Sequence, residues 1–261
     1  MNLTDMKFTD KRELKRFDLN LGNYSVSGAI CSYGDVIDFV DDLKQGIVLV
    51  DTCGHDEEVG KNMAAFLRTE IKNKWGVAGD AADNLEKLGR KLAVMRNPTI
   101  PYYKSDEWFD FVSAEYAQFD GDNISLAMGG GLGETLILRN NGQLESILMY
   151  GGTIDLHYLE IHEPAYATTL AKNEVMLLQS DGLLNNIEKN VYLSFSESRR
   201  KELDYGEFIR YMKSWLVSTI ADEIQEPAGI IRERIIDQYS SYFLPKSLRD
   251  DDVTFAVIKK I

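Results

Sequence analysis

The separation of strand-forming segments from helix-forming segments restricts the fold of this chain more than any other sequence feature. Short apolar runs rich in β-branched residues predict strands, whereas apolar residues that recur every three or four positions predict helices. Strands are expected at Tyr24–Cys31, Ile47–Val50, Phe111–Phe119, Ile124–Met128, Thr135–Arg139, Leu144–Tyr150, Glu174–Gln179 and Val253–Lys259. Helices are expected at Glu57–Trp75, Leu85–Met95, Lys201–Ile224 and Pro227–Phe243. Because these elements come in blocks and do not alternate, the sequence predicts an α+β fold.

The pattern runs along the whole chain without an internal repeat or a clear linker. The Asn140-Asn141-Gly142 run between two expected strands indicates a tight hairpin. A chain of 261 residues is long enough to bury a sizeable core. We therefore expect residues 1–261 to form a single domain.

Charge and composition exclude several classes of partner. The formal net charge of −13 disfavours a nucleic-acid partner, because phosphate backbones are neutralised by Lys and Arg. No apolar run is long enough to span a bilayer, and the N-terminal residues do not resemble a signal peptide. Two cysteines, Cys31 and Cys53, are too few for a disulfide framework. These features predict a cytoplasmic protein that binds neither nucleic acid nor a membrane.

Aspartates stand at the ends of four expected strands. Asp35 follows the first strand, with Asp38 three residues later, and Asp51 directly follows the Ile47–Val50 run. Asp181 comes just after another strand, and the run Asp250-Asp251-Asp252 precedes the last one. Converging carboxylates form a hard, oxygen-rich site that suits Mg²⁺ or Mn²⁺ better than zinc. A single aspartate beside glycine after a strand is more often a turn residue, so spacing alone leaves both interpretations open.

Five segments, taken in order, resemble the motifs of the PPM (type 2C) phosphatases, specifically the bacterial SpoIIE/RsbU branch. The motifs are G-D-x-x-D, D-x-x-G-H, F-[VA]-T-[AL], [ST]-D-G-[LV] and D-D-x-T. The matching segments are Gly34-Asp35-Val36-Ile37-Asp38, Val48–His55 followed by Met63-Ala64-Ala65, Phe111-Val112-Ser113-Ala114, Ser180-Asp181-Gly182-Leu183 and Asp251-Asp252-Val253-Thr254. The resemblance extends over nearly the whole chain, and the ordered set is more specific than any one motif.

The resemblance implies a four-layer α-β-β-α sandwich with two central antiparallel sheets and two Mn²⁺ or Mg²⁺ ions at one edge between them. By position in the motifs, Asp51 would bridge both ions and the backbone carbonyl of Thr52 would bind the second. Asp181 and Asp251 would hold the first ion, and Asp35 would act directly or through a water. A water activated between the ions would be the nucleophile, so the resemblance implies no covalent enzyme intermediate.

The function implied by the resemblance is metal-dependent hydrolysis of phosphoserine or phosphothreonine. The substrate would be a bacterial regulatory phosphoprotein, such as a STAS-type anti-sigma-factor antagonist. Two other functions stay open at this point: a PPM-like fold that binds a partner without turnover, and a hydrolase of small phosphate esters. Mn²⁺ titration separates the first of these from the phosphatase, and a comparison of substrates separates the second.

Three positions depart from the pattern of the branch. Asp56 stands where the branch usually has glycine, Gly129–Gly133 stands where it often has G-H-P, and Tyr33 replaces a glycine. None of the three removes an expected ligand, although the run Asp250–Asp252 leaves open which residue is the ligand. Residues 57–95 are the candidate regulatory region, because helices at this place can reposition a metal ligand in related enzymes.

Overall fold

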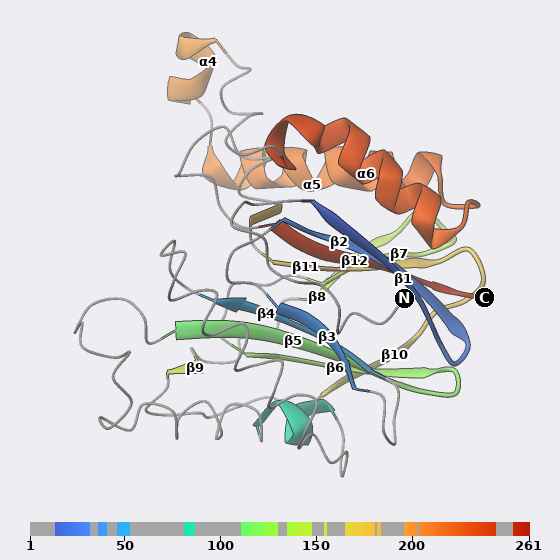
Figure 1. Ribbon diagram of the computed structural model, residues 1–261. Helices are drawn as coiled ribbons and strands as arrows, with labels where there is room; N and C mark the ends of the chain where they lie inside the picture. Colours follow the sequence, from blue (N-terminus) through green and yellow to red (C-terminus); the bar gives the residue numbers. More distant parts are fainter. Residues whose placement is uncertain are drawn as a thin grey trace.

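The computed structural model describes residues 14–31, 36–40, 46–52, 81–86, 111–129, 135–147, 154–155, 165–180, 182–183, 196–202, 204–243 and 253–261 (Figure 1). One group of strands comprises β1 (Lys15–Leu21), β2 (Tyr24–Cys31), β7 (Thr135–Leu138), β8 (Leu144–Ile147), β11 (Val175–Gln179) and β12 (Val253–Lys260). A second group comprises β3 (Val36–Val40), β4 (Gly46–Thr52), β5 (Phe111–Asp120), β6 (Asn123–Gly129), β9 (Ile154–Asp155) and β10 (Tyr166–Thr169). The helices are α4 (Glu197–Glu202), α5 (Tyr205–Asp222) and α6 (Ala228–Phe243), and residues 81–86 are also helical.

These strands form two six-stranded sheets. The order in the first sheet is β1-β2-β12-β11-β7-β8. The order in the second sheet is β10-β6-β5-β4-β3, with β9 paired to β5. Every pair in both sheets is antiparallel. The α+β class and the two central antiparallel sheets are therefore confirmed.

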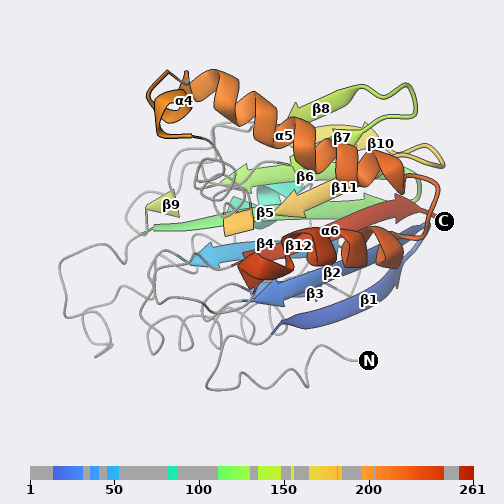
Figure 2. The ribbon, with the colours of Figure 1, turned by 90° about the horizontal axis from the view of Figure 1, so that it is seen from above.

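Helices cover the outer faces of both sheets. Helices α5 and α6 lie over the first sheet, where Leu216 and Ile231 join its outward side chains in one buried cluster (Figures 1 and 2). The helical residues 81–86 cover the second sheet, where the Asn84 amide donates to Gln118 Oε1 at 3.1 Å. The layers thus follow the predicted α-β-β-α order.

The main core lies between the two sheets. Alternate residues of the central strand β11 divide between the two sides: Val175 and Leu177 pack against the helices, whereas Met176 and Leu178 pack against the second sheet. Strand β12 divides in the same way, so both strands are apolar almost throughout, as expected for strands buried on two faces. The second sheet contributes to this layer with Ile47, Leu49, Ala117, Phe119, Ile124, Leu126 and Met128.

Polar side chains join the two sheets at the end where β1 turns into β2 and β5 turns into β6. The turn residue Asp122 accepts a hydrogen bond from Asn23 Nδ2 at 3.0 Å, and it forms an ion pair with Lys260 Nζ at 2.9 Å. The buried Tyr24 hydroxyl donates to the Asp122 carbonyl at 2.6 Å. These contacts connect the tips of two hairpins that belong to different sheets.

The hairpin at Asn140–Gly142 is confirmed. It connects β7 to β8, and two backbone hydrogen bonds of 2.9 Å close it: Arg139 N donates to Gln143 O, and Gly142 N donates to Arg139 O. Gly142 has a φ of 78°, a conformation that glycine adopts without the steric cost of a Cβ.

The structure also contains elements that the sequence pattern did not predict, namely β1, β3, β9 and β10. The expected helix Lys201–Ile224 is wrong at its start, because Lys201 belongs to α4 and α5 begins at Tyr205. Asp204 stands directly before α5, where aspartate is favoured as an N-terminal cap, which explains a new helix there. The expected helix Glu57–Trp75 lies outside the described residues, as does most of Leu85–Met95.

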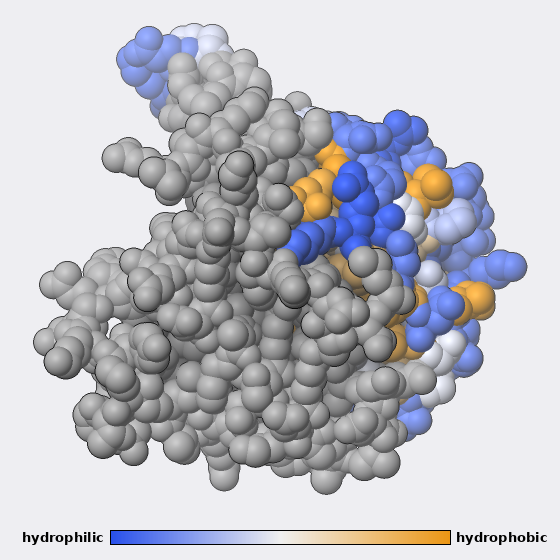
Figure 3. All heavy atoms as spheres, in the orientation of Figure 1, coloured by the Kyte–Doolittle hydropathy of each residue, from blue (hydrophilic) through white to orange (hydrophobic). Residues whose placement is uncertain are grey.

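The visible surface of the described residues is mostly hydrophilic, with apolar residues in small separate patches (Figure 3). Among those residues, no helix is both long and apolar enough to cross a membrane.

Candidate functional site

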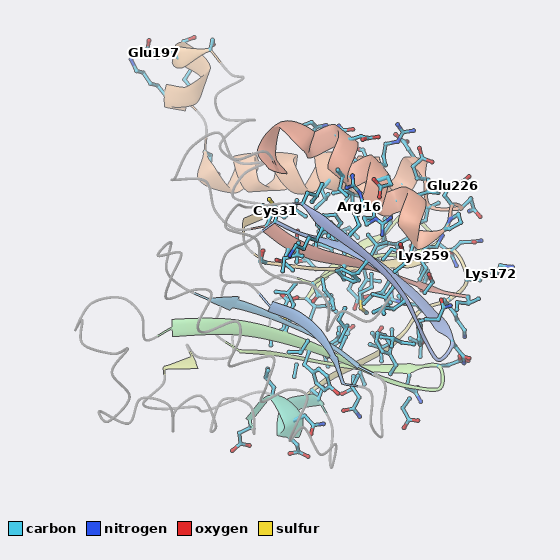
Figure 4. All side chains as sticks on the ribbon, in the orientation of Figure 1. Arg16, Cys31, Lys172, Glu197, Glu226 and Lys259 are labelled. Carbon is cyan, nitrogen blue, oxygen red and sulfur yellow. The ribbon has the colours of Figure 1, made fainter. Side chains whose placement is uncertain are left out.

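Three strand ends of the first sheet lie side by side. Strand β2 ends at Cys31, which pairs with Val253 at the start of β12. Strand β11 ends at Gln179, which pairs with Phe255 of β12. Because β2 and β11 are both antiparallel to β12, their ends and its beginning share one edge of the sheet. In Figure 4 the label of Cys31 marks this end and that of Lys259 marks the opposite one.

Strand ends of the second sheet gather in the same manner. The last residues of β4 are Asp51 and Thr52, which pair with Ser113 and Val112 near the start of β5. The first residue of β3, Val36, pairs with Val50 of β4.

The two sets of strand ends belong to the same end of the sandwich. Only residues 32–35 connect the end of β2 to the start of β3, a link that spans at most roughly 18 Å. In Figure 2 the arrows of β2, β4 and β11 point to the same side of the molecule, away from the C-terminus.

The expected site residues occupy positions at or next to these strand ends. Asp51 and Thr52 are the last two residues of β4, where the structure describes the backbone. Asp35 directly precedes β3, Asp181 is the second residue after β11, and Asp251 is the second residue before β12. These three lie outside the described residues, so the convergence of the four carboxylates stays a prediction. Within the described part of the chain, no three His, Cys, Asp or Glu side chains come together as a metal site.

Ser180 and Thr254 fix the two chain segments that lead to Asp181 and away from Asp251. The Ser180 amide donates to the Thr254 carbonyl at 2.8 Å, and the Thr254 amide donates to Ser180 Oγ at 3.0 Å. Both residues are buried. This reciprocal pair gives the serine hydroxyl of the S-D-G motif and the backbone of Thr254 in the D-D-x-T motif a structural role that motif spacing alone did not reveal.

Glu115 is a second feature that the sequence pattern missed. It lies on β5 with only 3% of its surface exposed, and its carboxylate oxygen Oε2 accepts a hydrogen bond from Thr135 Oγ1 at 3.5 Å. Thr135 belongs to β7 of the other sheet, so the contact crosses the inter-sheet layer. The spacing along β5 could have indicated this burial. Glu115 is two residues before Ala117 and four before Phe119, so it is on the same face of the strand as these two core residues.

Comparisons with known proteins find similarity in structure and not in sequence. No family model matches the chain, and no curated protein matches it. RsbX in complex with magnesium is 12% identical with a TM-score of 0.58, over 94% of this chain and 99% of that one. The SiaA-PP2C domain of Pseudomonas aeruginosa is 14% identical with a TM-score of 0.58, over 94% and 85%.

A third solved structure contains the PP2C phosphatase domain and a fragment of the regulatory domain of SpoIIE from Bacillus subtilis. It is 10% identical with a TM-score of 0.56, over 96% of this chain and 72% of that one. The structural similarity covers nearly the whole chain, as the motif resemblance does. The predicted resemblance to the SpoIIE/RsbU-like PPM phosphatases is thus confirmed at the level of the fold: the chain has the fold of PP2C-type phosphatase domains.

Proposed function

We propose that this protein is a metal-dependent phosphatase that hydrolyses phosphoserine or phosphothreonine on a protein substrate. One observation carries the proposal. The strand ends next to the motif aspartates come from both sheets, and they gather at one end of a PP2C-type sandwich. A turn role for each aspartate separately does not account for this grouping.

The donor set fits hard divalent cations. Asp35, Asp51, Asp181 and Asp251 would supply carboxylate oxygens, and Thr52 would supply its backbone carbonyl, so the set contains neither sulfur nor imidazole. Two Mn²⁺ or Mg²⁺ ions bound there would acidify a water and stabilise charge on the phosphoryl group.

Asp51 is the central residue of the proposed site. Because successive residues of a strand face opposite sides of the sheet, Asp51 is on the same face of β4 as Ile47 and Leu49, whose side chains pack between the sheets. Because β4 is paired on both sides, by β3 and by β5, its end is held firmly in the second sheet. This support suits a residue that must keep its position while a charged substrate binds.

The decisive experiment replaces single ligands. Asp51→Asn and Asp181→Asn should each abolish Mn²⁺-dependent hydrolysis of a phosphopeptide while circular dichroism shows a folded chain, since each change removes a cation-binding charge. Asp120→Asn is the matched control, because Asp120 is exposed at the opposite end of the second sheet. Full activity in either ligand variant would remove the proposed metal assignment.

A narrower part of the proposal concerns the substrate and its compartment. We infer a cytoplasmic bacterial regulatory protein of the STAS type, on the basis of the motif resemblance. The test compares a phosphorylated STAS-type protein with p-nitrophenyl phosphate at equal enzyme concentration. Preference for the small ester would favour a hydrolase of small phosphate esters instead.

A further inference from the structure

Ser180 is the residue at which the β11–β12 ladder ends and the next turn of the chain begins. Its amide donates to the Thr254 carbonyl at 2.8 Å, which extends the ladder by one residue beyond the last residue of β11. Its carbonyl accepts a hydrogen bond from the Leu183 amide at 3.4 Å and thereby closes the turn that contains Asp181. One residue therefore takes part in the sheet and in the turn at the same time.

The serine hydroxyl supplies a hydrogen-bond acceptor to the opposite strand. In a regular hydrogen-bonded pair of antiparallel strands, two residues exchange two bonds between backbone atoms. Here the Thr254 amide donates to Ser180 Oγ at 3.0 Å, while the carbonyl of Ser180 accepts from the turn. This bond depends on the side chain at position 180, whereas a bond between backbone atoms would form with most residues there.

Both expected ligands next to this junction are close in sequence to buried residues. Ser180 and Leu183 are each 1% exposed, and only Asp181 and Gly182 lie between them. Leu183 belongs to the apolar cluster between the first sheet and the helices. The second residue after Asp251 is Val253, which is buried in the same cluster. The chain is thus anchored on both sides of Asp181 and directly after the aspartate run.

We propose that Ser180 is a positioning residue for the divalent cation expected at Asp181 and Asp251, an inference that rests on the proposed function. Its hydroxyl holds the end of β11 against the start of β12 in the absence of a cation. Binding then has fewer backbone conformations to restrict, so less conformational entropy is lost and the affinity is higher. Ser180 acts through the two aspartates and does not itself bind the ion.

The first test measures Mn²⁺ affinity by calorimetry, without any substrate. Ser180→Ala removes the acceptor, and we expect it to weaken Mn²⁺ binding about tenfold, the factor that corresponds to ordering one further backbone residue on binding. Ser180→Thr keeps a hydroxyl at this position and should bind Mn²⁺ like the parent chain.

Ser27→Ala is the matched control. Ser27 is another buried serine of the first sheet, and its Oγ donates to Asp18 Oδ1 at 2.7 Å. It lies on β2 four residues before the strand end at Cys31, so the same substitution there removes a hydrogen bond away from the expected ligands. This control should bind Mn²⁺ like the parent chain.

A second measurement follows the junction itself in metal-free protein. Hydrogen exchange at the Thr254 amide should be faster in Ser180→Ala than in the parent chain, because the amide loses its acceptor. The exchange rate of the same amide should not change in Ser27→Ala.

Each outcome decides a separate question. Equal Mn²⁺ affinity in the parent and in Ser180→Ala, or an unchanged exchange rate at Thr254, overturns the role of Ser180 and leaves the proposed function intact. An equal loss of affinity in Ser27→Ala also overturns it, because the cause would then be general destabilisation. A parent chain that binds no Mn²⁺ overturns the proposed function and the inference with it.

A further variant covers the case in which Ser180→Ala does not fold. Ser180→Cys keeps nearly the same shape, but sulfur is a weak hydrogen-bond acceptor. Weaker Mn²⁺ binding in Ser180→Cys than in Ser180→Thr supports the inference, and equal binding in the two variants overturns it.

Discussion

At the scale of single residues, Arg139 makes the densest set of polar contacts in the described part of the chain. Its guanidinium donates to Glu145 Oε2 at 2.9 and 2.6 Å, and it donates to Glu174 Oε2 at 3.0 Å. It also donates to Thr168 Oγ1 at 2.8 Å and to the Thr169 carbonyl at 2.7 Å. Because Thr168 and Thr169 belong to β10, this one side chain connects edge strands of both sheets.

Arg139→Ala should lower the free energy of unfolding by about 2–4 kcal/mol, because it leaves two partly buried carboxylates without their cation. Urea denaturation measures the loss. Arg234→Ala is the control, since more than half of this arginine side chain is exposed and the loss of its ion pair with Glu223 should change stability less. Equal effects of the two substitutions would contradict a special role for Arg139.

The same network should make stability depend on pH. Burial alone would raise the pKa of Glu145, but hydrogen bonds from Tyr166 and Arg139 outweigh it and hold the pKa below its usual value. The pKa of Glu174 is lowered against burial by the Ala171 amide and by Arg139.

Two depressed carboxylate pKa values have a defined consequence for folding. The stabilisation is fully present above the ordinary glutamate pKa of 4.5 and is lost as the pH falls through the lower folded values. We expect a loss of unfolding free energy between pH 5 and the acid limit, and a smaller loss in Arg139→Ala. An identical pH profile in both proteins would show that other carboxylates dominate.

At the scale of elements, β2 depends on a glycine at its centre. A Cβ on Gly28 would lie 2.3 Å from the Phe255 carbonyl of the adjacent β12 and 2.2 Å from the Phe17 ring. Backbone atoms of a paired strand cannot move aside, so this position excludes any side chain. The absence of a side chain at Gly28 therefore leaves room for the Phe17 ring against β2.

Gly28→Ala should destabilise the protein by about 3 kcal/mol, the upper range for overpacking a core. Thermal unfolding is the measurement. Gly229→Ala in α6 is the matched control: the nearest atom to its Cβ is 3.5 Å away, so the change should be neutral or slightly stabilising in a helix. Similar losses in both variants would contradict the steric explanation.

The junction of β11 and β12 supports a prediction about activity. Ser180→Ala removes the acceptor of the buried Thr254 amide, which should cost about 1–3 kcal/mol. It should also lower the proposed phosphatase activity, because Asp181 follows Ser180 in the sequence and Asp251 precedes Thr254 by three residues. Ser218→Ala on an exposed face of α5 is the control. Unchanged activity in Ser180→Ala would show that the junction does not position the ligands.

Sequence periodicity predicted the buried elements well and the edge elements poorly. Strands such as β11 and β12 have long apolar runs because both faces are buried, and these runs stand out in the sequence. Strand β1 buries only residues such as Phe17 and Leu21, and β10 buries none of its residues fully, so their patterns are too weak to predict a strand. Register and long-range pairing decide such strands, and neither is visible in a local window.

At the scale of the whole molecule, the candidate site depends on arrangements that no local pattern contains. The positions of the expected strands located the aspartates at strand ends, but only the order of the motifs suggested that these aspartates act together. The structure brings the described strand ends to one end of the sandwich, and the structural similarity at 10–14% identity confirms the fold. The burial of Glu115 was missed because it follows from the pairing of β5 with β4 and β6. The extent of a single domain over residues 1–261 stays a prediction.

The central place of β12 in the first sheet affects how the chain is made. Strand β12 lies between β2 and β11, yet it leaves the ribosome after every other strand that the structure describes. Until then, β2 and β11 each present an unpaired row of amides and carbonyls beside an apolar face, which is a template for aggregation. Completion of the first sheet must therefore wait until residues 253–260 have been synthesised, and a holdase chaperone acting on the nascent protein would protect these open edges.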